Sequence, residues 1–386
     1  MNKTTTFHRD RFTWLAYLLL ALYGYFLNIL GPLTPYLKDE LGLSYTVSSL
    51  HFTAFAAGML LVGLSGGIVI QRVGRGPALW LGAFGVGFGA ILLLLGRTAV
   101  LTIGASFLMG LIGSLILVIV PSALSDEYGE ARAVALSEGN VIASAFSMVA
   151  PLMVGWTAPL LLGWRLALGA AAFLPLPLYL IFRNVAPPQT AIQAGSTSTH
   201  KPLPFLFWVY WVAIVLGVSL EFCMISWSAD YLEKTLFIPR ADAAQSVSLF
   251  LLAMIFGRMA ASRLVQRFSV HRVVIGFILT TALGFSLFWL TGSRLPSLAG
   301  LFLTGLGVAG LYPLLLSIAM GVTTDTTQAS ARATLASGTA ILLLPLTLGR
   351  LADLVGIQQA YGVVAVLLVC LLGIVLAAGR KNTGHA

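Results

Sequence analysis

The stretch FLFWVYWVAIVLGVSLEFCMISWS, residues 205–228, is an apolar run with one charged residue, Glu221. A membrane-spanning α-helix needs about 20 consecutive apolar residues, because each residue advances the helix by about 1.5 Å across a hydrocarbon core about 30 Å thick. The stretch therefore predicts a transmembrane helix with a carboxylate near its middle.

The composition of the whole chain agrees with this interpretation. Of the 386 residues, 58% are apolar and 9% are charged, whereas a water-soluble domain carries about 25% charged residues. Both cysteines, Cys223 and Cys370, lie in apolar runs without metal-ligand spacing. A soluble enzyme is excluded, and we expect no disulfide framework, no metal site and no cofactor.

Twelve apolar runs of this kind follow one another along the chain. They cover residues 12–36, 45–70, 78–96, 100–123, 135–160, 165–183, 205–228, 243–265, 273–291, 298–322, 334–349 and 360–379. The chain is thus predicted to be an all-α membrane protein with twelve transmembrane helices. Because twelve is even, both termini lie on the same side of the membrane.

The basic residues indicate which side that is. With a cytoplasmic N-terminus, fourteen Lys and Arg residues fall in inside segments, seven fall outside and one, Arg258, lies within a span. Cytoplasmic loops carry such an excess, so we expect a multi-pass protein of the cell membrane with both termini cytoplasmic. The net charge of +9 then reflects topology, and no nucleic-acid partner is expected. The alternative is a signal peptide starting at residue 12, but that run lacks a small-residue cleavage site.

The longest polar stretch, residues 184–204, divides the runs into six and six. It contains Pro187-Pro188 and a run of Gly, Ser and Thr, and is predicted to be a flexible cytoplasmic linker. Residues 1–183 and 205–386 are then two six-helix bundles.

Short sequences at equivalent span boundaries recur in the two halves. YLKDEL at 36–41 returns as YLEKTL at 231–236, and VIQR at 69–72 returns as LVQR at 264–267, both 195 positions later; ARA at 131–133 returns at 331–333. These landmarks indicate a duplication. Six spans return the chain to its starting side, so the copies have parallel topology, a pseudo-twofold axis along the membrane normal and a binding place between them near the mid-membrane.

The loop after the second span carries a short motif. Residues 67–75, GIVIQRVGR, resemble the signature of the major facilitator superfamily of secondary transporters, which is Gly, three residues, Asp-Arg, one residue, Gly-Arg. Gly67, Arg72, Gly74 and Arg75 match, and Gln71 replaces the Asp. A degenerate second copy after span eight contains Gln266 and Arg267, and Gly163-Trp164-Arg165 is another frequent family feature.

The resemblance implies the major facilitator fold, alternating access and a gating role for these loop residues. In the family this loop is thought to latch the halves in the outward-open state. With Gln71 in place of a carboxylate, we expect a weaker latch. The alternative is that Arg72 and Arg75 only set topology.

Two further features bear on the branch of the family. Many proton-coupled drug exporters of the superfamily carry an Arg in span four, whereas residues 101–122 here have no charge. Glu221, followed by Trp227, Asp230 and Tyr231 and joined by Gly257-Arg258 on span eight, resembles the fucose and glucose permease branch.

The charged residues inside the spans are the leading functional candidates. A mid-membrane carboxylate costs about 2.5–3.5 kcal/mol to insert, so it usually faces a wet cavity and has a task. We assign Glu221 to proton coupling or to substrate binding. The alternative is a protonated Glu hydrogen-bonded to a neighbouring helix. Arg258 either pairs with a carboxylate or substrate or extends to the cytoplasmic edge.

Polar residues at helical spacing are candidates for the lining of the substrate cavity. They are Tyr25 and Asn28 on span one, Asn140 and Ser144 on span five, Ser228 on span seven, Gln245 and Ser248 on span eight, and Tyr312 on span ten. Each is alternatively a hydrogen-bonding contact between helices. Tyr312-Pro313 and Pro345 are predicted bending points.

These observations predict a secondary active transporter that moves a small organic solute by alternating access, coupled to protons. Its partners are then the solute, protons and membrane lipid, and we expect a monomer. The alternative is a proton-antiport exporter of drugs or metabolites. An intramembrane enzyme is disfavoured because the five histidines show no ligand spacing, and a channel is disfavoured because no filter-like loop occurs.

Overall fold

The computed structural model describes residues 8–188, 203–323 and 326–383, and within these residues the regular secondary structure is helical. Twelve helical segments are long and apolar enough to cross a membrane. The prediction of an all-α protein with twelve spans is therefore confirmed. Most of the predicted linker, residues 189–202, lies outside the described residues.

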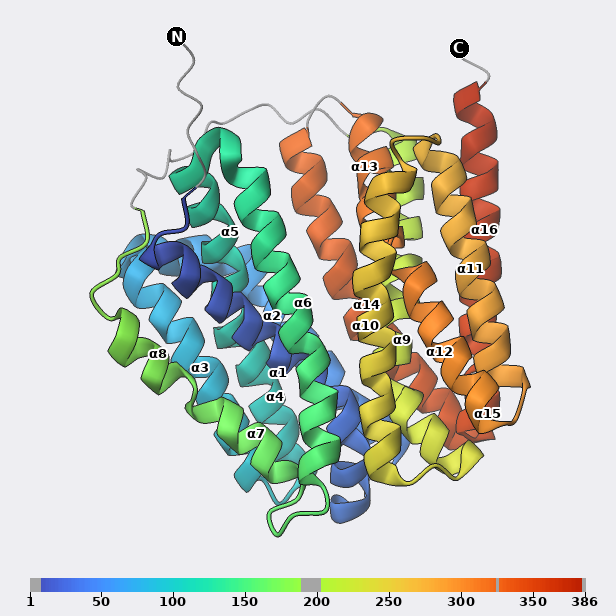
Figure 1. Cartoon of the computed structure of the whole chain (residues 1–386), viewed down its shortest axis with the longest axis horizontal. Helices are drawn as coiled ribbons and strands as arrows, with labels where there is room; N and C mark the ends of the chain where they lie inside the picture. Colours follow the sequence, from blue (N-terminus) through green and yellow to red (C-terminus); the bar gives the residue numbers. More distant parts are fainter. Residues whose placement is uncertain (1–7, 189–202, 324–325, 384–386) are drawn as a thin grey trace. The chain divides into compact units, whose positions relative to one another are not determined.

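Six spans precede the linker (Figure 1). They are α1 (Arg11–Leu41), α2 (Tyr45–Val73), α3 (Arg75–Leu95), α4 with α5 (Ala99–Gly113 and Leu115–Tyr128), α6 (Arg132–Thr157) and α7 with α8 (Trp164–Phe173 and Pro175–Phe182). The short 3-10 helix η1 (Gly129–Ala131) joins α5 to α6.

Six spans follow the linker. They are α9 (Phe205–Leu236), α10 (Arg240–Leu264), α11 (Val270–Leu290), α12 with α13 (Arg294–Val308 and Leu311–Gly321), α14 (Thr326–Val355) and α15 with α16 (Ile357–Ala360 and Gly362–Thr383). Several helices extend beyond the predicted apolar runs, because a backbone in a membrane must satisfy its own hydrogen bonds up to the interface. The last turns of α1 and α9 consequently carry charged residues as part of the helix.

The described residues form two compact units. One unit draws on the described residues within Met1–Leu30 and Ala54–Ser196, and the other draws on those within Gly31–Thr53 and Thr197–Ala386. The end of α1 and the start of α2 therefore pack with the helices that follow the linker. That residues 1–183 and 205–386 form two separate six-helix bundles stays a prediction.

Close helix contacts made by glycines repeat in the two units. In the first unit a methyl group on Gly110 of α4 would overlap the carbonyl oxygen of Phe55 in α2. In the second unit a methyl group on Gly305 of α12 would overlap the carbonyl oxygen of Phe250 in α10. Gly305 follows Gly110 by 195 positions and Phe250 follows Phe55 by 195 positions, which is the offset of the repeated sequence landmarks.

A second pair of contacts follows the same spacing. Gly89 of α3 lies against the backbone nitrogen of Met109 in α4, and Gly284 of α11 lies against that of Thr304 in α12; again 284 − 89 and 304 − 109 both equal 195. Each unit thus repeats the contacts of the other, which supports the duplication inferred from the sequence.

The breaks in the fourth and tenth spans are also equivalent. The chain passes from α4 to α5 at Ser114 and from α12 to α13 at Ala309-Gly310. The predicted bend at Tyr312-Pro313 lies directly after the second break, whereas Pro345 lies inside the continuous helix α14. Span ten is therefore divided close to Tyr312, one of the predicted cavity residues.

Candidate transport site

The helix α9 is the centre of the second unit. It contacts α10, α12, α13, α14 and α16, and most of its residues from Gly217 to Leu232 are buried. A helix that is apolar on all sides is expected in such a position. Two of its acidic residues, the half-buried Glu221 and the buried Asp230, lie about 13 Å apart along the axis at about 1.5 Å per residue.

Glu221 stands among polar groups from three other helices. Its carboxylate interacts electrostatically with Arg258 of α10 and with Tyr312 of α13, whose hydroxyl forms a hydrogen bond with Ser337 of α14. We call Glu221, Arg258, Tyr312 and Ser337 the Glu221 cluster. It combines a carboxylate, a guanidinium and two hydroxyls, groups that donate or accept hydrogen bonds.

The two charged side chains of this cluster are not fully buried. The Glu221 side chain is half-buried and that of Arg258 is exposed, although both lie well within their helices. Charged side chains at such depth face a bundle interior or a water-filled cavity. The structure thus brings together three residues selected from the sequence. Ser337 was missed, because a lone Ser within the Ala- and Gly-containing run TLASGTA gives no sequence signal.

The polar candidates on α1 and α6 lie in the first unit. The Tyr25 hydroxyl donates to the Ala167 carbonyl oxygen at 3.0 Å, and the Asn28 amide donates to the Gly24 carbonyl oxygen of its own helix at 2.9 Å. Asn140 is exposed and Ser144 is half-buried. Tyr25 and Asn28 thus have local partners, and a role for these four residues in substrate binding stays a prediction.

The remaining candidates lie on α9 and α10. Gln245 is half-buried and Ser248 is buried. Ser228 is fully buried, and its hydroxyl has no hydrogen-bond partner among the described residues. Its place in a substrate cavity also stays a prediction.

A buried charge cluster at Asp230 of α9 was not anticipated from the sequence. Lys38 Nζ of α1 lies 2.7 Å from Asp230 Oδ1, and Tyr45 of α2 donates its hydroxyl to Asp230 Oδ2 at 2.7 Å. The ammonium also lies 3.7 Å from the centroid of the Tyr45 ring. We call these three residues the Lys38–Asp230 cluster. Lys38 is one of the seven basic residues that the predicted topology places outside the membrane, but its side chain is only 7% exposed and that of Asp230 is 0% exposed.

Neighbouring contacts fix the start of α2 against α9 and α14. The ring of Trp227 lies 5.4 Å from that of Tyr45, and its Nε1 donates to the Pro345 carbonyl oxygen at 3.1 Å. Asp353 of α14 accepts hydrogen bonds from the backbone N–H groups of Tyr45 and Thr46, each at 2.8 Å. A carboxylate at a helix N-terminus satisfies donors that the helix itself leaves unpaired.

A more exposed charge network lies next to this cluster. Arg240 of α10 pairs with Glu233 of α9 at 2.7 Å and with Asp39 of α1, and Lys234 lies 3.3 Å from Glu233. The Lys38–Asp230 cluster and this Arg240 network together hold residues 31–53 against the helices that follow the linker. Removal of residues 31–53 from these helices would separate a buried ion pair, which is costly unless water or another charge replaces each partner.

The loop motif at residues 67–75, for which the family resemblance predicts a gating role, lies in the first unit. Gly74 has φ +87° and begins the turn into α3, a conformation that favours glycine. Arg75 pairs with Asp126 at the end of α5 at 2.6 Å and donates to the Pro188 carbonyl oxygen at 2.8 Å. Gly67, Gln71 and Arg72 are exposed, as are Gln266 and Arg267 of the second copy. Arg75 therefore makes specific contacts, which a residue that only sets the topology does not need.

Comparison with known proteins agrees with this architecture. The sequence profile described as Major Facilitator Superfamily matches residues 16–244. An uncharacterized MFS-type transporter of Yersinia pestis is 28% identical over 180 residues, an alignment that covers 45% of this chain and 47%, about half, of that relative.

Solved structures with the same fold share little sequence with this chain. A bacterial homolog of the human lysosomal transporter Spinster, in an inward-facing and occupied conformation, superposes with a TM-score of 0.81 at 14% identity over 96% of each chain. A D-xylose-proton symporter superposes with a TM-score of 0.74 at 16% identity over 95% of each chain. With a family match over more than half of its length and twelve membrane-spanning helices, this chain belongs to the Major Facilitator Superfamily of transporters.

Proposed function

We propose that this protein is a secondary active transporter that moves a small polar or amphiphilic organic solute by alternating access, coupled to protons. The Glu221 cluster is the observation that carries the proposal. It combines a carboxylate, a guanidinium and two hydroxyls from four helices of one unit.

The chemistry of the pair formed by Glu221 and Arg258 supports coupling. An ionised carboxylate in mid-membrane is costly, and the positive charge of Arg258 offsets part of that cost. Protonation of Glu221 removes this attraction and releases the guanidinium for another anionic or polar group. Proton binding and solute binding at the same cluster are then linked, which is what a coupled transporter requires.

The Lys38–Asp230 cluster supports alternating access. It stabilises one packed arrangement of residues 31–53 on α9 and α14 through charges that lose their partners when these helices separate. A transporter needs such an arrangement to be stable yet reversible. The fold also accommodates coupled transport, since a structural neighbour is a D-xylose-proton symporter.

The test begins with the solute. Thermal stabilisation of the purified chain across a panel of sugars, organic acids, amino acids and cationic drugs identifies a ligand, because a molecule that binds only the folded state raises the melting temperature. Uptake of that ligand into proteoliposomes under an imposed pH gradient then measures coupling. The direction of the gradient that drives accumulation distinguishes symport from antiport export.

The decisive variant is Glu221→Gln. We expect it to abolish proton-driven accumulation and to spare counterflow, which needs no net proton movement. Glu127→Gln is the matched control, because Glu127 is an exposed acidic residue at the end of α5, and it is expected to leave both activities unchanged. Normal accumulation by Glu221→Gln would refute Glu221 as the coupling residue.

A further inference from the structure

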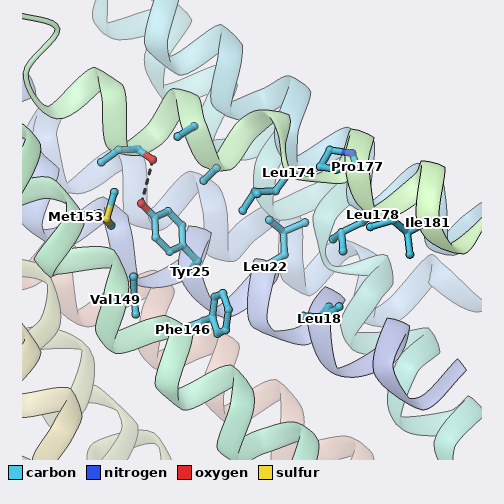
Figure 2. A pocket seen from close by; sticks show the side chains of 13 residues that line it. Leu18, Leu22, Tyr25, Phe146, Val149, Met153, Leu174, Pro177, Leu178 and Ile181 are labelled. Atoms are coloured by element: carbon cyan, nitrogen blue, oxygen red, sulfur yellow. Dashed lines mark hydrogen bonds between the residues drawn. The ribbon is translucent and has the colours of Figure 1, made fainter. Parts of the chain in front are cut away.

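An apolar groove runs along the first unit between α1, α6 and α7–α8. Its volume is about 390 Å³, which lies within the range of small-molecule sites. Figure 2 shows Leu18, Leu22 and Tyr25 of α1 between the side chains of α6, among them Val149 and Met153, and those of α7–α8.

The lining of the groove excludes a polar ligand. The Tyr25 hydroxyl is the one polar side-chain group among the lining residues, and it already donates to the Ala167 carbonyl oxygen (Figure 2). A sugar or an amino acid placed here would leave its own polar groups without partners, at a cost of about 1–3 kcal/mol for each. A hydrocarbon chain carries no such groups.

Two hydrogen bonds join α1 to α7–α8 at the ends of the groove. Tyr25 reaches Ala167 at one end, and Arg11 Nη2 donates to the Ile181 carbonyl oxygen at 2.8 Å at the other. Each pair of anchor points is fourteen residues apart (25 − 11 and 181 − 167), or about 21 Å at 1.5 Å per residue. The residues of α7–α8 that line the groove cover this whole stretch, from Ala167 to Ile181, whereas those of α1 cover the part from Leu18 to Tyr25.

The Arg11 end of the groove is positively charged. Arg11 is exposed, lies 6.0 Å from the centroid of the Phe182 ring and uses one of its five N–H donors for Ile181. Arg183, directly after Phe182, is exposed as well. A guanidinium binds a phosphate through paired hydrogen bonds, so this end complements an anionic headgroup.

We infer that this groove is a binding site for an anionic membrane phospholipid, with one acyl chain between Leu18 and Met153 and the phosphate at Arg11. Exposed rim residues such as Phe146, Leu174 and Ile181 leave the groove open along its side. A chain enters it from the membrane without crossing a polar surface. The site is separate from the Glu221 cluster, which belongs to the other unit.

Native mass spectrometry of the full chain tests the site. The protein is incubated in detergent with phosphatidylglycerol, with phosphatidylcholine of the same acyl chains, or with oleic acid. We expect wild type to retain one phosphatidylglycerol and about fivefold less phosphatidylcholine. Arg11→Gln should lower phosphatidylglycerol retention about fivefold, the effect of one basic residue beside an anionic surface.

Filling the groove should abolish retention of both phospholipids. Ala170→Phe fills it from α7 and Val149→Phe fills it from α6, so that one variant tests the site if the other fails to fold. The matched controls are Leu180→Phe, on the exposed side of α8, and Arg263→Gln, an exposed Arg of α10; both should behave as wild type. Equal retention by the filled variants and wild type, no preference for phosphatidylglycerol, or retention of oleic acid in place of phosphatidylglycerol would each overturn the inference.

Discussion

Lys38 and Asp230 form a buried ion pair, in which the ammonium nitrogen lies 2.7 Å from a carboxylate oxygen and Tyr45 donates a hydrogen bond to the other oxygen. The two residues are 192 positions apart. Lys38 lies in the stretch YLKDEL at 36–41, and Asp230 directly precedes the similar stretch YLEKTL at 231–236. The likeness of these two stretches is part of the evidence for the duplication. Equivalent ends of spans one and seven are thus joined by opposite charges.

Loss of either partner alone should strongly destabilise the folded state. Lys38→Met leaves Asp230 buried without its cation, and Asp230→Leu leaves Lys38 without its anion; each should lower the free energy of unfolding by about 3–5 kcal/mol. The double variant leaves no unpaired charge, so it should recover most of this loss. Thermal unfolding in detergent measures all three.

An exposed ion pair gives the control for this comparison. Lys234→Met removes a lysine that is 40% exposed beside Glu233, and exposed pairs contribute about 0–1 kcal/mol. Its melting temperature should stay close to that of wild type. A double variant no more stable than the single variants would contradict the view that the buried pair, and not the side-chain volume, sets the stability of this end.

The close glycine contacts lead to a second prediction. A methyl group at Gly110 or Gly305 would overlap a backbone carbonyl oxygen of the neighbouring helix, and backbone cannot move aside as a flexible side chain does. Gly110→Ala and Gly305→Ala should each cost about 1–3 kcal/mol of stability, the usual cost of overpacking.

Gly104 provides the control on the same helix as Gly110. A methyl group there has open space around it, so Gly104→Ala should be neutral or stabilising by up to about 1 kcal/mol, because alanine favours a helix over glycine. If Gly104→Ala destabilised the protein as much as Gly110→Ala, helix flexibility and not close packing would explain the glycines.

The sequence predicted the elements of the fold well, for identifiable physical reasons. Hydropathy marks each span because a membrane penalises every exposed polar group, and the structure confirms twelve spans. The glycine contacts were not predicted, although they follow the repeat offset of 195, since composition alone does not tell a contact glycine such as Gly110 from an open one such as Gly104.

The candidate site was predicted only in part. Glu221 and Arg258 stood out because charge is rare within spans. Lys38 and Asp230 lie at helix ends, where charge is common and has no special meaning in a sequence. Their pairing depends on which helix ends meet in three dimensions, and no local pattern encodes that. Ser337 was missed for the related reason that serine occurs throughout such helices.

The gating motif leads to a third prediction, because its two arginines differ in environment. Arg75 is 13% exposed and pairs with Asp126 at 2.6 Å, whereas Arg72 is exposed. Arg75→Gln should lower the free energy of unfolding by about 1.5–3 kcal/mol, the range for a hydrogen bond to a charged group. Arg72→Gln should change it by less than about 0.5 kcal/mol. Equal effects of the two variants would favour topology as the only role of these residues.

The last prediction concerns Arg258, which interacts electrostatically with Glu221. Arg258→Gln removes the positive charge, so initial rates of proton-driven uptake should fall about tenfold or more, the rate equivalent of losing a charge-assisted interaction of about 1.5 kcal/mol. Arg258→Lys keeps the charge and should retain part of the rate. Arg263→Gln removes an exposed arginine five residues further along α10. Uptake by this variant should match wild type. Uptake of a radiolabelled ligand into proteoliposomes, normalised to the amount of reconstituted protein, separates these outcomes. If Arg258→Lys were as inactive as Arg258→Gln, the geometry of the guanidinium and not its charge would be the property on which transport depends.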